Sequence, residues 1–121
     1  MAIQDGHLGI NSVALTGNKT LAEADCGTVQ VVNATATITL PSTVVGMTFI
    51  VEVGQTSTGA APTVNVSPAA LDKIMGNGFT SADNKDAIST AGRAGDRIVL
   101  VGDGANGWFV QEVRGTWTRE A

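Results

Sequence analysis

Residues 95–117 contain the feature that most constrains the fold, because two β-rich runs there flank a glycine-rich reversal. The runs cover residues 97–101 and 108–113, and the loop between them carries Gly102, Asp103, Gly104, Asn106 and Gly107. These residue types tolerate the positive φ angles that a tight reversal requires. The segment also holds both tryptophans, Trp108 and Trp117, which offer the largest area for packing. We therefore expect a β-hairpin against which the rest of the chain packs.

The composition predicts one globular β-rich domain. The chain has 121 residues, enough to bury one core of its own but not two. Apolar residues make up 43% of the chain and aromatic residues only 4%, so the core must consist mainly of aliphatic side chains and threonine methyl groups. Fifteen glycines and a charged fraction of 15% favour many tight turns between short strands.

The remaining strands are predicted from alternation of apolar and polar residues. Residues 28–32 and 35–40 are expected to be strands joined by a turn at Asn33 and Ala34, and residues 64–67 form another. In residues 47–53 the odd-numbered side chains should face the core. We expect roughly seven to nine short strands in all. The predicted fold class is an all-β, single-domain antiparallel β-sandwich or barrel with at most one or two short helical turns.

Helical structure is expected to be limited. Thr20 and Glu23 have the spacing of a capping box, and Gly27 is placed to end one short turn. Residues 69–79 are compatible either with a short helix that ends at the glycines or with a loop followed by a strand. The sequence alone leaves these alternatives open.

The N-terminal segment lacks a clear period, and we divide the chain into an extended arm at residues 1–19 and a β-domain at residues 20–121. The arm would expose Ile3, Leu8 and Ile10 unless another surface covers them. It is therefore either a docking tail or a frayed terminus.

The sequence contains no recognisable reaction centre. His7 is the only histidine and lies in the predicted arm, while Cys26 has acidic neighbours and is expected to be a small buried apolar residue. One histidine and one cysteine cannot supply a zinc site. Residues 103–107 resemble part of a calcium loop, but a hairpin turn built on Asp103 explains them better. We expect no enzyme activity, and no catalytic, cofactor-binding or metal-binding residues.

Charge and hydropathy also argue against two kinds of partner. The net charge is −4 and no basic run exceeds one residue, so nucleic acid is not an expected partner. The longest apolar stretch is interrupted by Pro41 and Gly46, so a membrane is not expected either. A single cysteine and the lack of a secretion signal at residue 1 suit synthesis in a reducing cytoplasm.

A series of local patterns, taken in order, resembles a β-module of tailed-bacteriophage virion proteins. The resemblance rests on residues 21–27, 37–41, 46–49, 64–67, 74–76, 95–101, 103–104, 107–108 and 115–117. Similar modules occur in small head decoration (cement) proteins and in tail fibres. The order and spacing of the patterns carry this resemblance, which covers roughly residues 21–117.

The resemblance implies a structural protein, usually a homotrimer, with no catalytic residues to carry over. We expect a capsid decoration protein that is made in the host cytoplasm, binds the major capsid protein on the outer head surface of the virion and stabilises the shell. The expected capsid contacts lie in the arm, at Ile3, His7, Leu8 and Ile10. The alternative is a receptor- or glycan-binding module of a tail fibre or baseplate, which would use the loops at residues 54–61, 76–86 and 103–107.

Deletion of residues 1–9 tests the arm directly. If the arm docks onto the capsid, its removal abolishes capsid binding and leaves the fold intact, which co-sedimentation with capsids and circular dichroism would measure. Unchanged binding would show that the arm is not the dock.

Overall fold

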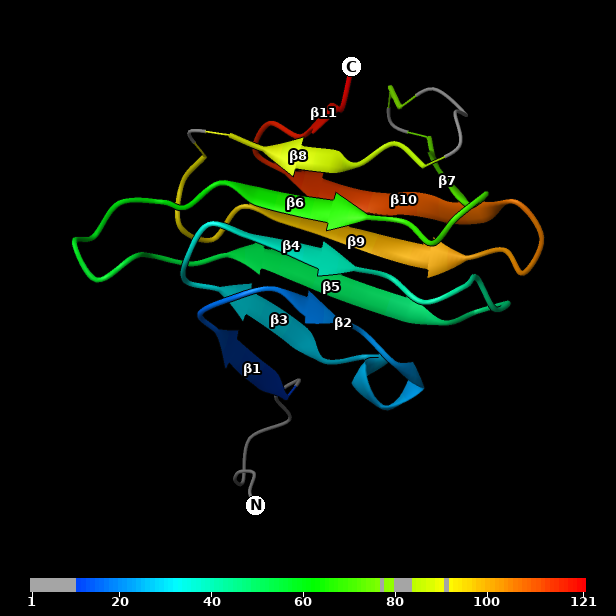
Figure 1. Ribbon diagram of the computed structural model, residues 1–121, viewed down its shortest axis with the longest axis horizontal. Coiled ribbons are helices and arrows are strands. Elements are labelled where there is room, and N and C mark those ends of the chain that lie inside the picture. The colour runs from blue at the N-terminus through cyan, green and yellow to red at the C-terminus, as the bar shows by residue number, and fades with distance from the viewer. Residues whose placement is uncertain (1–10, 77, 80–83, 91) are drawn as a thin grey trace.

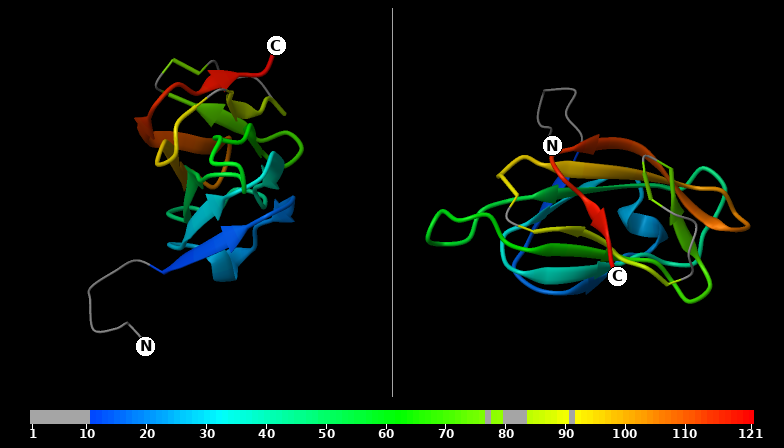
Figure 2. Two further views of the ribbon diagram at one scale, coloured as in Figure 1. Left: turned by 90° about the vertical axis from the view of Figure 1, so that its left-hand side faces the viewer. Right: turned by 90° about the horizontal axis from the view of Figure 1, so that it is seen from above.

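The structure is a computed structural model that describes residues 11–76, 78–79, 84–90 and 92–121. The described residues form eleven short strands and one 3-10 turn, η1 (Glu23–Asp25), arranged as two sheets packed face to face (Figures 1 and 2). The six-stranded sheet contains, in spatial order, β1 (Ser12–Leu15), β3 (Val29–Val32), β5 (Thr48–Val53), β9 (Arg97–Gly102), β10 (Gly107–Arg114) and β7 (Lys73–Met75). The five-stranded sheet contains β11 (Thr118–Arg119), β8 (Ala87–Ser89), β6 (Val64–Ser67), β4 (Ala36–Thr39) and β2 (Lys19–Thr20). The predicted single-domain all-β fold is confirmed.

Successive strands from β1 to β6 alternate between the two sheets, so the chain winds as a flattened coil (Figure 1). Within each sheet the coiled strands are parallel: β1 pairs with β3, β3 with β5, β2 with β4, and β4 with β6. Parallel neighbours require a crossover, and here the strand of the opposite sheet supplies it. The expectation of an antiparallel sandwich is therefore wrong in this half of the chain, and both sheets are mixed.

The segment at Asn33 explains this difference. Its backbone N–H donates to the Leu15 carbonyl at 2.7 Å, and its Oδ1 accepts from the Gln55 N–H at 3.1 Å. These bonds tie Asn33 to the preceding and the following turns of the coil. Residues 33–34 consequently form the predicted turn as a connection from β3 to β4 in the other sheet, and the two strands do not pair as a hairpin.

The central hairpin is present as predicted. β9 and β10 pair antiparallel, with a bulge between Val110 and Glu112, and β9 also pairs antiparallel with β5. The Trp108 side chain is fully buried between the sheets, and its ring centroid lies 5.4 Å from that of Phe49 on β5. The odd-numbered residues of β5 face the core as expected, and Trp117 is buried as well.

Three local expectations need correction. The helical turn exists as η1, but its N-cap residue is Ala22 and not Thr20, and the Ala22 N–H donates to Asp25 Oδ2 at 2.9 Å. Cys26 is exposed, not buried, and its Sγ accepts a bond from the Thr48 N–H at 3.2 Å. The predicted arm is too long, because the structure places residues 12–15 in β1 and Lys19 in β2. Residues 69–79 follow the second alternative, a loop and then β7.

Gly107 allows β7 to pair with β10, and we predict that Gly107→Ala destabilises the protein by more than about 3 kcal/mol. Its φ is +148°, and an added Cβ would collide with the backbone of Lys73 on β7. Gly59→Ala is the matched control, because Gly59 also has a positive φ, +86°, but open space around it. The control should cost about 1 kcal/mol. Equal losses in urea unfolding would contradict the steric argument.

Candidate binding surfaces

The four arm residues expected to contact a capsid, Ile3, His7, Leu8 and Ile10, lie outside the described residues. Asn11 immediately precedes β1. Strands β1, β3 and β5 are parallel, and β5 begins just after the loop at residues 42–47. Asn11 therefore lies towards the same end of the six-stranded sheet as that loop.

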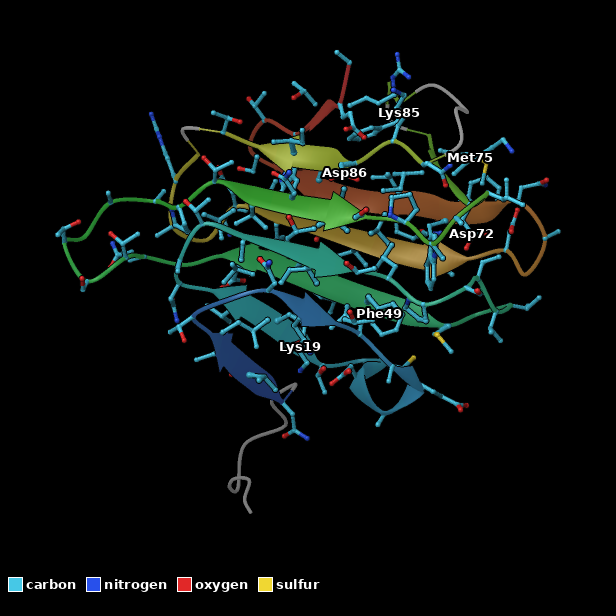
Figure 3. The ribbon with its side chains drawn as sticks, in the orientation of Figure 1. Lys19, Phe49, Asp72, Met75, Lys85 and Asp86 are labelled. Atoms are coloured by element: carbon cyan, nitrogen blue, oxygen red, sulfur yellow. The ribbon has the colours of Figure 1, made fainter. Side chains whose placement is uncertain are left out.

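Thr43 joins three loops at this end of the molecule. Its backbone N–H donates to Asp72 Oδ2 at 2.9 Å, its hydroxyl donates to the Gly107 carbonyl at 2.6 Å, and the Gly104 N–H donates to Thr43 Oγ1 at 3.1 Å. We call this end of the sandwich the tip and define it as residues 42–47, 69–72 and 103–107. Figure 3 shows Asp72 at the tip, beside the ends of β7 and β9. The three loops form a single cross-linked surface.

The tip carries three of the four exposed large hydrophobic side chains among the described residues. Val44 is 51% exposed, Val45 77% and Leu71 72%. Fully burying an aliphatic side chain of this size stabilises a complex by about 1.5–3 kcal/mol. Three such side chains on hydrogen-bonded loops are a ready site for protein contact.

Leu71 also has an unusual backbone conformation. Its φ is +72°, a region that costs an L-residue about 1–2 kcal/mol. Asn84 holds it there, because Asn84 Oδ1 accepts from the Leu71 N–H at 2.7 Å while the Asn84 N–H donates to the Asp72 carbonyl at 3.0 Å. A large apolar side chain is thus kept in solvent at a position where glycine would be less strained. Strain of this kind often marks a functional position.

Sequence reasoning named the loop at residues 103–107 as a candidate binding loop but missed the exposed apolar residues of the tip. Val44 and Val45 lie outside any alternating run, and Leu71 belongs to the segment whose structure was left open. The available signal was the pair of adjacent β-branched residues between Pro41 and Gly46, since apolar residues in a turn have no core to enter.

A second apolar surface covers the outer face of the six-stranded sheet. One row across the strands contains Val29, Ile50 and Val99, which are register partners from β3 to β9, and it ends at Glu112 on β10. The next row contains Val101 and Phe109 and continues to Met75 on β7, whose side chain is buried. Phe109 is 46% exposed. In the right-hand view of Figure 2 this outer face lies along the upper side of the molecule.

The outer face of the five-stranded sheet differs in chemistry. Its side chains are mostly short and polar, and they come from Thr37, Thr39, Asn65, Ser67, Ile88 and Thr118. Hydroxyl and amide groups keep their hydrogen bonds to water at such a surface. The two outer faces of the sandwich are therefore unequal, and only one of them is apolar.

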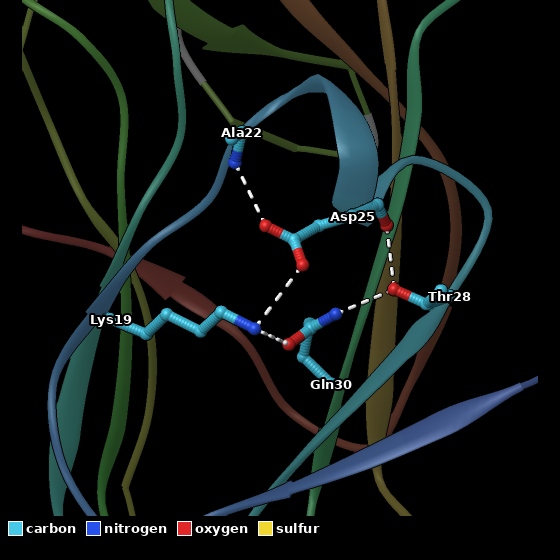
Figure 4. A network of polar contacts seen from close by, with 5 residues as sticks. All are labelled: Lys19, Ala22, Asp25, Thr28 and Gln30. Atoms are coloured by element: carbon cyan, nitrogen blue, oxygen red, sulfur yellow. Dashed lines mark hydrogen bonds and ion pairs between the residues drawn. The ribbon is translucent and has the colours of Figure 1, made fainter.

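A polar network closes the sandwich near β2 and η1 (Figure 4). Lys19 Nζ donates to Asp25 Oδ1 at 3.2 Å and to Gln30 Oε1 at 3.1 Å, and Gln30 Nε2 donates to Thr28 Oγ1 at 2.6 Å. The N–H of Ala22, and to a smaller extent Lys19, lower the pKa of Asp25, opposed by partial burial. Each polar group of this network has a partner, which is the arrangement of a structural cap.

Of the loops expected to take part in glycan binding, the one at residues 103–107 is a turn closed by its own aspartate. Asp103 Oδ1 accepts the N–H groups of Ala105, Asn106 and Gly107 at 2.7–2.9 Å, which confirms the predicted turn. Donation from the Gly107 N–H, followed by that from Ala105, lowers the pKa of Asp103. The carboxylate is thus occupied within its own loop. The loop at residues 76–86 includes residues that the structure does not describe.

A shallow pocket lies beside β11. It is lined by Gly78, Phe79, Trp117, Thr118 and Arg119 and has a volume of about 300 Å³. Phe79 and Trp117, the aromatic residues in its wall, are both largely buried. The guanidinium of Arg119 and the hydroxyl of Thr118 add polar groups of the kind that hold a sugar.

Within the described ranges, no helix is long and apolar enough to cross a membrane, and no group of three or more potential ligand side chains is placed to hold a metal ion. Comparisons with protein-family models, curated proteins and solved structures give no match to this chain.

Asp86 lies next to β8, and its shifted pKa predicts that its effect on the stability of the fold depends on pH. Burial raises its pKa, as does the nearby Glu120, while hydrogen bonds from Ser67 and Asn65 oppose the shift. A raised folded-state pKa means that this group favours folding at low pH and that its contribution is lost as the pH rises through the folded pKa. Asp86→Asn should therefore raise the melting temperature at neutral pH, with the gain vanishing below about pH 4.

Asp103→Asn should change the melting temperature at neutral pH in the opposite direction. The folded-state pKa of Asp103 is lowered, so its stabilising contribution exists at neutral pH and is lost as the pH falls through the folded value. This variant should melt below wild type at neutral pH. Thermal melts followed by circular dichroism check both variants, and a lower melting temperature for Asp86→Asn would contradict the assignment.

Proposed function

We propose that this chain is a bacteriophage capsid decoration protein that binds the outer head surface as a homotrimer and stabilises the shell. The observation that carries the proposal is the tip, where Val44, Val45 and Leu71 are exposed on loops held together by hydrogen bonds. The resemblance of residues 21–117 to virion β-modules supports the same role. In this proposal the protein acts by adhesion and not by catalysis, with the major capsid protein as its partner.

The tip suits a partner that presents many equivalent sites. Each of its aliphatic side chains is already partly covered, so burying them adds a few kcal/mol per subunit at most, about the energy of a weak contact. Three copies in one trimer engage the shell together, and effective concentration converts weak contacts into avidity. Asn11 lies towards the same end of the sheet, so an arm that docks could do so beside the tip.

The second candidate is a receptor- or glycan-binding module of a tail fibre or baseplate. The pocket of Phe79, Trp117 and Arg119 favours it, because aromatic surface beside polar donors is a common arrangement for sugars. A glycan array separates the two proposals. Glycan binding that Arg119→Ala removes would favour this candidate, whereas an array without hits favours decoration.

Val45→Asp tests the tip. The charge would have to be desolvated on docking, so we expect the affinity for purified heads to fall by about 10- to 100-fold while the melting temperature stays unchanged. Co-sedimentation with heads that lack the protein measures the affinity. Ala60→Asp is the matched control, because it adds the same charge at an exposed position of the loop at residues 54–61, away from the tip.

Leu71→Gly is a second tip variant with a distinctive signature. It removes the apolar side chain and relieves the positive φ, so binding should fall although the protein does not lose stability. If Val45→Asp and Leu71→Gly both bind heads as wild type does, the tip is not the docking surface. If wild type itself does not bind heads, the decoration proposal fails.

A further inference from the structure

The orientation of β3 shows that the apolar outer face is built into the strand register. Gln30 points into the sandwich and is fully buried, while Val29 and Val31 point outward. The register is fixed, because Val32 is fully buried and a shift by one residue would expose it. Lys19 and Thr28 satisfy the amide of Gln30. The strand therefore keeps a polar group inside while two valines face out.

The same pattern continues across the sheet. β5 and β9 have fully buried inward residues, and their outward partners include Ile50, Val99 and Val101. Strands that are apolar on both faces are normally covered on both faces. Three pockets of the described surface are lined by residues other than Val29, Ile50, Val99, Val101 and Phe109. This face suits a flat partner, such as another sheet.

Charged side chains gather at one end of this face. The register aligns Glu52 with Arg97 and Arg97 with Arg114, and Glu112, which lies beside Val99 in the next row, pairs with Arg97 at 2.8 Å. Two acidic and two basic groups give this patch no net charge. A patch of this kind can meet an identical patch with opposite charges in contact, while a partner of one charge sign would meet repulsion.

We propose that the outer face of the six-stranded sheet is the interface between copies of this chain, packed around an axis that runs along the strands. The inference rests on the homotrimer of the proposed function and adds the surface that forms it. An axis along the strands keeps corresponding residues at one level, so the apolar part of each face meets apolar residues and the charged patch meets its own copy. Sheets packed face to face commonly keep their strands aligned in this way.

This arrangement has a consequence for docking. The tip lies at an end of the strands, so an axis along the strands directs the tips of all copies the same way. Each assembled particle would then present several sets of Val44, Val45 and Leu71 to one surface. The sheet interface and the tip remain separate surfaces of each subunit.

Ile50→Lys and Ile88→Lys form a matched pair for the test. Both residues are half-buried isoleucines that face outward from a strand with neighbours on both sides, but Ile50 lies on the apolar sheet and Ile88 on the polar one. Sedimentation equilibrium of the full chain without capsids measures assembly. We expect wild type and Ile88→Lys to be oligomers at about 50 µM and Ile50→Lys to dissociate with an increase in Kd of about 100-fold or more.

The double variant Val99→Thr/Val101→Thr distinguishes weakened assembly from misfolding. Threonine keeps the β-branched shape that a strand favours, so a folded chain with weakened assembly is expected. A monomeric wild type, an oligomer that survives Ile50→Lys, or equal dissociation by Ile88→Lys would overturn the interface. The decoration proposal is judged separately by binding to heads: Val45→Asp should lose that binding and remain oligomeric.

Discussion

The packing of Trp108 against Phe49 between the two sheets determines how the strands around it are oriented. Trp108 is the second residue of β10, and Phe49 lies on β5, with β9 paired between them. This contact fixes the inward faces of three neighbouring strands at once. Because side chains alternate along a strand, fixing the inward faces also determines which side chains face out. The apolar outer face of the six-stranded sheet is thus a result of the core register.

The sequence predicted the features that depend on short-range patterns. The central hairpin was predictable because Gly104 and Gly107 lie between two β-rich runs, and the inward face of β5 was predictable from its alternation. The turn at Asp103 was predictable because aspartate can accept bonds from the N–H groups that follow it. In each case the residues that determine the structure are neighbours in the chain.

The coil could not be predicted in the same way, because its pairings join residues about 17–28 positions apart, such as Ser12 with Val29 and Ile38 with Val66. A turn of two residues at Asn33 is equally compatible with a hairpin, and only bonds to Leu15 and Gln55 decide against it. The candidate site was missed for a related reason. Leu71 is exposed because of Asn84, thirteen residues away, and no local pattern indicates that clamp.

The alternation of strands between the sheets has a consequence for how such a chain can change in length. Each turn of the coil contributes one strand to each layer, and β1 and β2 end the coil at the margin of their sheets. Duplication of a complete turn would widen both layers by one strand and leave the existing pairs in register. Insertions of whole turns are therefore tolerated by the geometry in a way that partial insertions are not. The sandwich can therefore gain or lose one strand in each sheet without a change in the loops that meet at Thr43.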